Sequence, residues 1–235
     1  MIFIRSALPL MAAAMLAGSA FADHSASAAT SNAPTAFAIL QPETSRDGYL
    51  ARLLINEVPF PGERGYVSVA DSKAAMLSVL WVLHARLRYV PNGYKPEELA
   101  VPAAGSDIFD LITAPRQCEG FHRAADGSLT MDRRVGERIT YLLRIANSGG
   151  APGRFAELLN YAQTLATAYL DAGEQGEDLF KGLTVVGGVA VTGRAYSWMA
   201  GQDVYDPGGN FVSIPEANRG ILGGNRFFTL RKDPK

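Results

Sequence analysis

The sequence has one cysteine in 235 residues and only three histidines, which limits both how the protein is held together and which chemistry it can use. A single thiol forms no intramolecular disulfide, so the fold must depend on its hydrophobic core. Cys118 with His84 and His122 also falls short of any recognisable zinc-ligand spacing. We therefore expect no metal and no other cofactor.

The sequence also lacks an excess of positive charge and a long hydrophobic run. Its 22 Lys and Arg residues nearly balance 23 Asp and Glu residues, for a net charge of −1, and no basic stripe or tail is present. This balance argues against nucleic acid as a partner. The apolar stretch 7–17 contains Pro9 and is shorter than the roughly 20 residues that span a bilayer. We expect no stable membrane insertion once the leader is removed.

Residues 1–22 have the three regions of a secretory signal peptide. Arg5 provides the positive start, an apolar stretch follows, and Ala20-Phe21-Ala22 forms a small-x-small cleavage site. The pattern predicts a cleaved signal peptide and a periplasmic or secreted protein, the alternative being a leader retained as a membrane anchor. Residues 23–44 are rich in Ala, Ser, Thr, Asn and Pro, a composition typical of a flexible linker. Residues 45–235 then form one predicted domain.

The hydrophobic periodicity of this domain predicts an α+β fold that is mostly α-helical, with a small β element toward the C-terminus. The expected helices share apolar positions three and four residues apart and cover residues 45–58, 68–90, 106–113, 134–146 and 153–171. The expected strands are β-branched or aromatic and cover residues 183–186, 189–192 and 226–230.

Glu57 is the most informative single residue of the sequence. It continues the apolar helical face of Leu50, Leu53 and Leu54, and Pro59 ends the helix directly after it. Burial on such a face raises the pKa of a carboxyl group and keeps it protonated, which is the state that a general acid needs for glycoside cleavage. The alternative is that Glu57 turns outward at the helix end and is simply solvated.

Four short stretches, in order along the chain, resemble the cell wall hydrolase family typified by the spore-cortex-lytic enzyme SleB. In that family a helix ends in Glu and a Gly-rich loop follows, and its Glu matches Glu57. The stretches are the helix 50–58, the second helix 78–87, a Pro-x-Gln-Phe-like loop within 112–121, and a closing strand 223–228.

The resemblance implies a lysozyme-like fold that cleaves peptidoglycan glycan strands, as a lytic transglycosylase, with one Glu as acid and then base and no metal. The sequence departs from the family at Ala85, where Asn precedes the Arg of the second helix, and at Cys118, where Phe follows Gln. These departures leave open a second hypothesis, a non-catalytic envelope protein that binds peptidoglycan on the same scaffold.

Four further residues are candidates for substrate binding. Gln117 has the amide to hydrogen-bond a sugar, and Glu119 is a candidate groove carboxylate in the same loop. Tyr196 and Trp198 lie in a Gly-rich region and have the rings to stack on sugar faces, with ordinary core packing as the alternative.

A glycoside hydrolase that retains or inverts the configuration at the anomeric carbon would need a second carboxylate near the first. Asp71 is better interpreted as a helix cap and Glu63 as a solvated loop charge, which leaves Glu119. The absence of a clear second acid favours transglycosylase chemistry.

A competing enzyme hypothesis uses Cys118 as the nucleophile of a papain-like cell-wall peptidase, because Cys118-Glu119-Gly120 has the look of its Cys-x-Gly motif. Such a peptidase needs a distant His base with an orienting partner. Neither His84 nor His122 lies in a later strand followed by Asn or Asp. A buried, unreactive thiol is the simpler interpretation.

Overall fold

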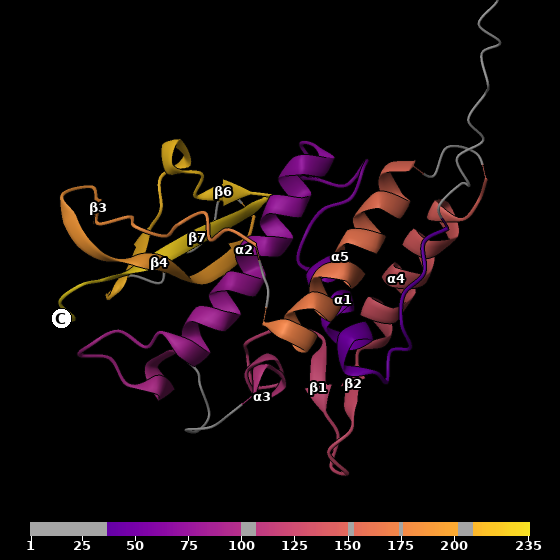
Figure 1. The fold of residues 1–235 in the computed structure, drawn as a ribbon, viewed down its shortest axis with the longest axis horizontal. Coiled ribbons are helices and arrows are strands. Elements are labelled where there is room, and N and C mark those ends of the chain that lie inside the picture. The colour runs from indigo at the N-terminus through magenta and orange to yellow at the C-terminus, as the bar shows by residue number, and fades with distance from the viewer. Residues whose placement is uncertain (1–36, 100–106, 150–152, 174–175, 202–208) are drawn as a thin grey trace, which may run out of the picture. The chain divides into compact units, whose positions relative to one another are not determined.

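Five α-helices and two antiparallel sheets form the described part of the chain in the computed structural model, which covers residues 37–99, 107–149, 153–173, 176–201 and 209–235 (Figure 1). The α+β class expected from the sequence is confirmed. The helices are α1 (Arg46–Asn56), α2 (Val69–Arg88), α3 (Ile108–Ile112), α4 (Arg133–Ala146) and α5 (Gly153–Ala172), with short 3₁₀ turns at Pro96–Leu99 and Glu216–Asn218. The predicted signal peptide lies outside the described residues.

The larger sheet has five strands around a long central pair. β4 (Val189–Ala200) pairs with β7 (Asn225–Arg231), and β3 (Val185–Val186), β5 (Phe211–Ser213) and β6 (Ile221–Leu222) extend this pair. A two-stranded sheet of β1 (Phe121–Arg123) and β2 (Leu129–Met131) lies between α3 and α4 in the sequence. β4 has 12 residues, three times as many as the strand predicted at 189–192. The prediction ended the strand before Gly193, but this glycine (φ 82°) lets β4 continue through an irregular stretch of its pairing with β7.

α1 is the centre of the helical part. Its residues Gly48–Ile55 are all buried, and α1 packs against α5, α4 and α2 (Figure 1). The Ser45 hydroxyl caps the N-terminus by accepting from the Gly48 amide, and the helix ends at Glu57, as Pro59 predicts. α2 contacts both α5 and β4, so it joins the helices to the larger sheet.

The segment 37–41 is held against α4 and α5 by side-chain amides. Asn147 accepts from the Ala38 amide at 2.9 Å and donates to the Ala38 carbonyl at 3.2 Å, while Gln163 accepts from the Gln41 amide at 2.9 Å. The predicted linker extends to residue 44, but residues 37–44 are therefore part of the domain. The sequence pattern missed this because the amides that bind the segment lie more than 100 residues away.

Among the described helices, none combines the length and the apolar character that crossing a bilayer requires.

Candidate active site

The side chain of Glu57 lies where the end of α1 meets the larger sheet. Its backbone N–H donates to Leu53 as the C-cap of α1, and its Oε2 atom accepts a 2.8 Å hydrogen bond from Nε1 of Trp198 on β4. Glu57 is half-buried. The alternative of a freely solvated charge at the helix end is therefore wrong.

Burial raises the pKa of the Glu57 carboxyl above its usual range. Hydrogen bonds from Trp198 and Asn56 and the positive charge of Arg138 act in the opposite direction, and the charge of Glu119 adds to the increase. Because burial dominates, the group stays protonated to a higher pH than an exposed glutamate does. This is the protonation state that a general acid requires.

Asn225 at the start of β7 fixes the backbone on which Glu57 stands. Its Nδ2 atom donates to the Glu57 carbonyl at 2.6 Å and lies 3.4 Å from the Gly223 carbonyl. Two acceptors on this side show that the amide nitrogen faces Glu57, which leaves Oδ1 of Asn225 buried and without a partner among the described residues. The orientation of the helix end is thus set from the sheet.

Arg138 on α4 also fixes this backbone. Its guanidinium donates to the carbonyls of Ile55 at 2.8 Å and Val58 at 3.0 Å, which flank Glu57. The same group forms a two-pronged ion pair with Glu63, with distances of 3.0 and 2.6 Å. Glu63 was expected to be a solvated loop charge, and that expectation is wrong because Arg138 and the Phe60 amide hold both of its oxygens.

Two pockets meet at Glu57. One of about 770 Å³ is lined by Pro59, Glu63, Arg138 and the glycines 223 and 224, among others. The other, of about 600 Å³, is lined by residues from α2, β4 and the loop before β1: Arg86, Arg116, Gln117, Glu119 and Trp198 are among them. Both share Asn56, Glu57 and Ala200. Glu57 therefore lies between two open spaces.

The wall of the 770 Å³ pocket depends on a close approach of backbone. A Cβ atom on Gly223, which has φ 52°, would lie 2.7 Å from Cβ of Ala75. The Asp71 carboxylate accepts from the Gly223 amide at 2.7 Å and so anchors this turn to α2. The sequence interpretation of Asp71 as a helix cap is corrected, because Ser68 caps α2 and Asp71 binds the turn.

The structure brings four of the five predicted site residues together. Gln117 accepts from Nη1 of Arg86 at 2.7 Å, and Glu119 forms an exposed ion pair with Arg134 at 2.8 Å. Both line the 600 Å³ pocket with Glu57 and Trp198. They come from α1, β4 and the loop before β1, so the fold assembles residues that are far apart in the sequence.

Tyr196 does not belong to this group. Its ring is 2% exposed, and its hydroxyl donates to the Tyr89 carbonyl at 2.7 Å. No ring face is free for a sugar to stack on, so the expectation of a sugar platform at Tyr196 is wrong. Tyr196 is instead a core residue, which was the alternative interpretation of the sequence.

Sequence reasoning missed Arg86 and Arg138, although a signal was present. Arg86 continues the buried α2 positions Val79, Val82 and Leu83, and Arg138 occupies the same face of α4 as Val135 and Leu142. A charge on an apolar helical face is the feature that identified Glu57. The same criterion, applied to positively charged residues, would have identified Arg86 and Arg138.

Cys118 is buried, and burial raises the pKa of its thiol, which is the opposite of what a nucleophile needs. In the described part of the chain, neither His84 nor His122 is hydrogen-bonded to this thiol: His84 contacts Tyr169, and His122 contacts Asp132. In addition, no group of three metal-binding side chains occurs in the described ranges.

We expect the thiol of native protein to resist alkylation by iodoacetamide, and we expect Cys118→Ala to leave any cleavage of peptidoglycan unchanged. Loss of activity on alkylation, measured beside an untreated sample, would instead support the cysteine-peptidase hypothesis.

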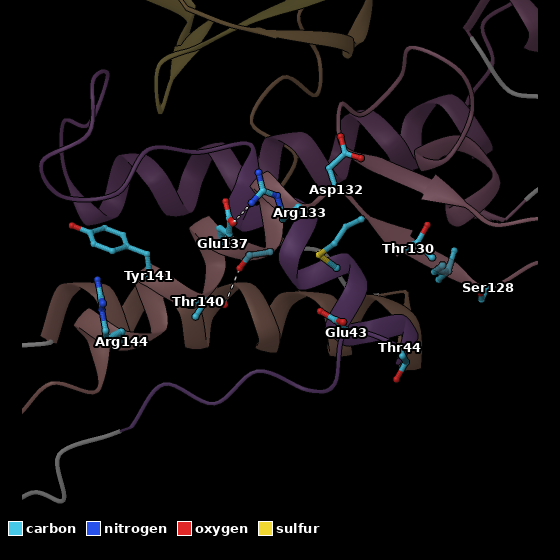
Figure 2. Close-up of a pocket in the computed structure, with 13 residues that line it drawn as sticks. Glu43, Thr44, Ser128, Thr130, Asp132, Arg133, Glu137, Thr140, Tyr141 and Arg144 are labelled. Carbon is cyan, nitrogen blue, oxygen red and sulfur yellow. Dashed lines mark hydrogen bonds and ion pairs between the residues drawn. The ribbon is translucent and has the colours of Figure 1, made fainter.

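A further pocket of about 780 Å³ lies between β2 and α4, and Glu57 is not among its lining residues (Figure 2). Two of its lining residues, Arg133 and Glu137, form an ion pair, and their side chains are 89% and 62% exposed. Such exposed pairs on one helix are ordinary surface features. The buried acid and its partners distinguish the pockets at Glu57 from this one.

Comparisons of the chain with family models, curated proteins and solved structures found no significant match.

Proposed function

We propose that this protein cleaves the glycan strands of peptidoglycan, with Glu57 as the general acid and then the general base. The main support is that Glu57, a half-buried residue whose carboxyl has a raised pKa, lines both pockets. A polymer that is cut internally needs binding space on each side of the cleaved bond. The half-buried acid at this junction fits a bond that crosses from one pocket to the other.

In the proposed reaction, protonated Glu57 gives its proton to the glycosidic oxygen as the bond from that oxygen to C1 breaks. In the transglycosylase route, the C6 hydroxyl of the same sugar then attacks C1 and returns its proton to the Glu57 carboxylate. The product carries an anhydro ring, and water is not consumed. Hydrolysis would use water in place of the C6 hydroxyl.

The neighbouring carboxylates favour the transglycosylase route. Glu63 is held by Arg138, and Glu119 is an exposed side chain paired with Arg134. Neither is a free carboxylate positioned as a second catalytic group, which retaining and inverting hydrolases require. The proposal places the protein among lysozyme-like cell wall hydrolases that act in the periplasm or after secretion.

Mass spectrometry of purified peptidoglycan digested with the protein tests this function. We expect anhydro-sugar products from glycan cleavage. Reducing-end products would indicate hydrolysis, and peptide fragments would support the Cys118 hypothesis. Binding to peptidoglycan without any release of fragments would support the non-catalytic hypothesis.

Trp198→Phe tests the contact between Trp198 and Glu57. The change keeps an aromatic ring but removes the N–H that favours ionised Glu57, so the pKa of Glu57 should increase further. Because the acid must be protonated, the alkaline limb of the kcat/KM profile should move to higher pH. An alkaline limb that stays in place or moves to lower pH would contradict this role.

A further inference from the structure

Arg86 is a buried cation without a carboxylate partner among the described residues. It lies in the last turn of α2, is 8% exposed, and forms none of the described ion pairs. Burial lowers the pKa of Arg86 to about 10, which still leaves it charged at neutral pH. Buried charges are costly and are normally paired. A missing protein partner for Arg86 is explained if the anion that pairs with it belongs to a ligand.

The guanidinium of Arg86 is fixed by neutral acceptors. Its Nε atom donates to the Tyr196 carbonyl at 2.6 Å and its Nη1 atom donates to Gln117 at 2.7 Å, while the Trp198 ring lies 5.8 Å away. These contacts hold the planar group in one orientation and use only part of its donors.

The described residues use two of the five N–H donors of Arg86, so three are left, and Arg86 lines the 600 Å³ pocket. The Nη2 atom of Arg86 has no hydrogen-bond partner among the described residues, and it is not one of their fully buried orphan atoms, which are Ser78 Oγ, Trp81 Nε1 and Asn225 Oδ1. A guanidinium that is fixed in orientation and has unused N–H donors at a pocket wall is suited to binding a carboxylate.

The carboxylates of this pocket leave Arg86 available. Glu119 pairs with Arg134, and Glu98 accepts from the Lys95 amide at 3.0 Å. Burial raises the pKa of Glu57, which favours its neutral form, and its Oε2 atom accepts a hydrogen bond from Trp198. An incoming anion would therefore find a cation that no described carboxylate neutralises.

We propose that Arg86 binds a carboxylate of the glycan beside the cleaved bond and selects acidic strands over neutral ones. This inference rests on the proposed function. Every second sugar of peptidoglycan has a lactyl group, whose carboxyl is either free or linked to a peptide that carries further carboxylates. Chitin has similar N-acetylated sugars but none of these groups. Arg86 thus determines specificity and takes no part in the proton transfers.

The first test changes the ligand and leaves Arg86 in place. Binding is measured with Glu57→Gln protein, which does not consume the ligand, on peptide-free glycan strands before and after reduction of their lactyl carboxylates to alcohols. We expect reduction to weaken binding about tenfold or more, as for loss of a charged hydrogen bond. Equal binding to both preparations would overturn the inference. Strands that retain their peptides show whether a peptide carboxylate can replace the lactyl one.

The second test changes the protein. Arg86→Gln, in the same Glu57→Gln background, should bind the native and the reduced strands equally, whereas Arg144→Gln, which removes an exposed arginine of α4, should keep the difference. General loss of structure would weaken both ligands together. If Arg86→Gln does not fold, the ligand comparison still decides.

The two proposals fail in different ways. Protein with Glu57 intact that cleaves native and reduced strands at the same rate refutes the role of Arg86 and leaves the proposed function standing. Protein that cleaves neither strand refutes the proposed function and, with it, the carboxylate site.

Discussion

Glu57→Gln is expected to lower the rate of glycan cleavage by about 10²–10⁴-fold, the usual contribution of general acid–base catalysis. The glutamine amide has the size of the carboxyl group and can still accept the hydrogen bond from Trp198, so the pockets should keep their shape. Release of soluble fragments from peptidoglycan measures the effect. A variant with wild-type activity would refute the assignment of Glu57 as the acid.

The same variant should also show how burial affects stability. Because the folded pKa of Glu57 is raised, its protonated form is favoured in the folded state, and this stability is present at low pH and lost as the pH rises through the raised pKa. Glutamine does not ionise. The Tm of Glu57→Gln relative to wild type should therefore increase as the pH rises above about 4, the ordinary pKa of glutamate, and through the raised pKa. The exposed Glu137→Gln serves as the control and should show no such trend.

The helical half of the fold could be predicted because its signals are local. The Ser68 cap marks the start of α2, Pro59 marks the end of α1, and the apolar periodicity places α4 and α5 to within one residue at each end. The strands β1, β2, β5 and β6 were missed. Each has only two or three residues, and β5 and β6 are defined by their pairing with β7, which no short window of sequence contains.

Tyr196 and Trp198 show why the site could be predicted only in part. In a regular strand, residues two apart face the same side, so the sequence treats the two rings as equivalent. The pairing of β4 with β7 shifts register between Ala195 and Ser197. The hydroxyl of Tyr196 binds Tyr89, whereas the indole of Trp198 binds Glu57, 141 positions away in the sequence. Only the three-dimensional packing separates a core residue from a partner of the acid.

Arg138→Gln is expected to destabilise the protein by about 2–3 kcal/mol. The change removes the ion pair with Glu63 and the bonds to the Ile55 and Val58 carbonyls. The estimate is below the cost of breaking a fully buried pair, because the two side chains are 23% and 35% exposed. Urea denaturation at constant pH measures the loss.

Arg134→Gln is the matched control, since Arg134 lies one turn earlier on α4 and pairs with Glu119 at a similar distance, but with side chains 71% and 84% exposed. It should cost less than about 1 kcal/mol. Equal midpoints for the two variants would show that Arg138 does not support the end of α1. If Arg138 does support the end of α1, Arg138→Gln should also reduce cleavage under conditions where the protein is still folded, because the backbone on both sides of Glu57 loses its hydrogen-bond donors. Stability and catalysis would then depend on the same guanidinium group, although it lies on a different helix from the acid.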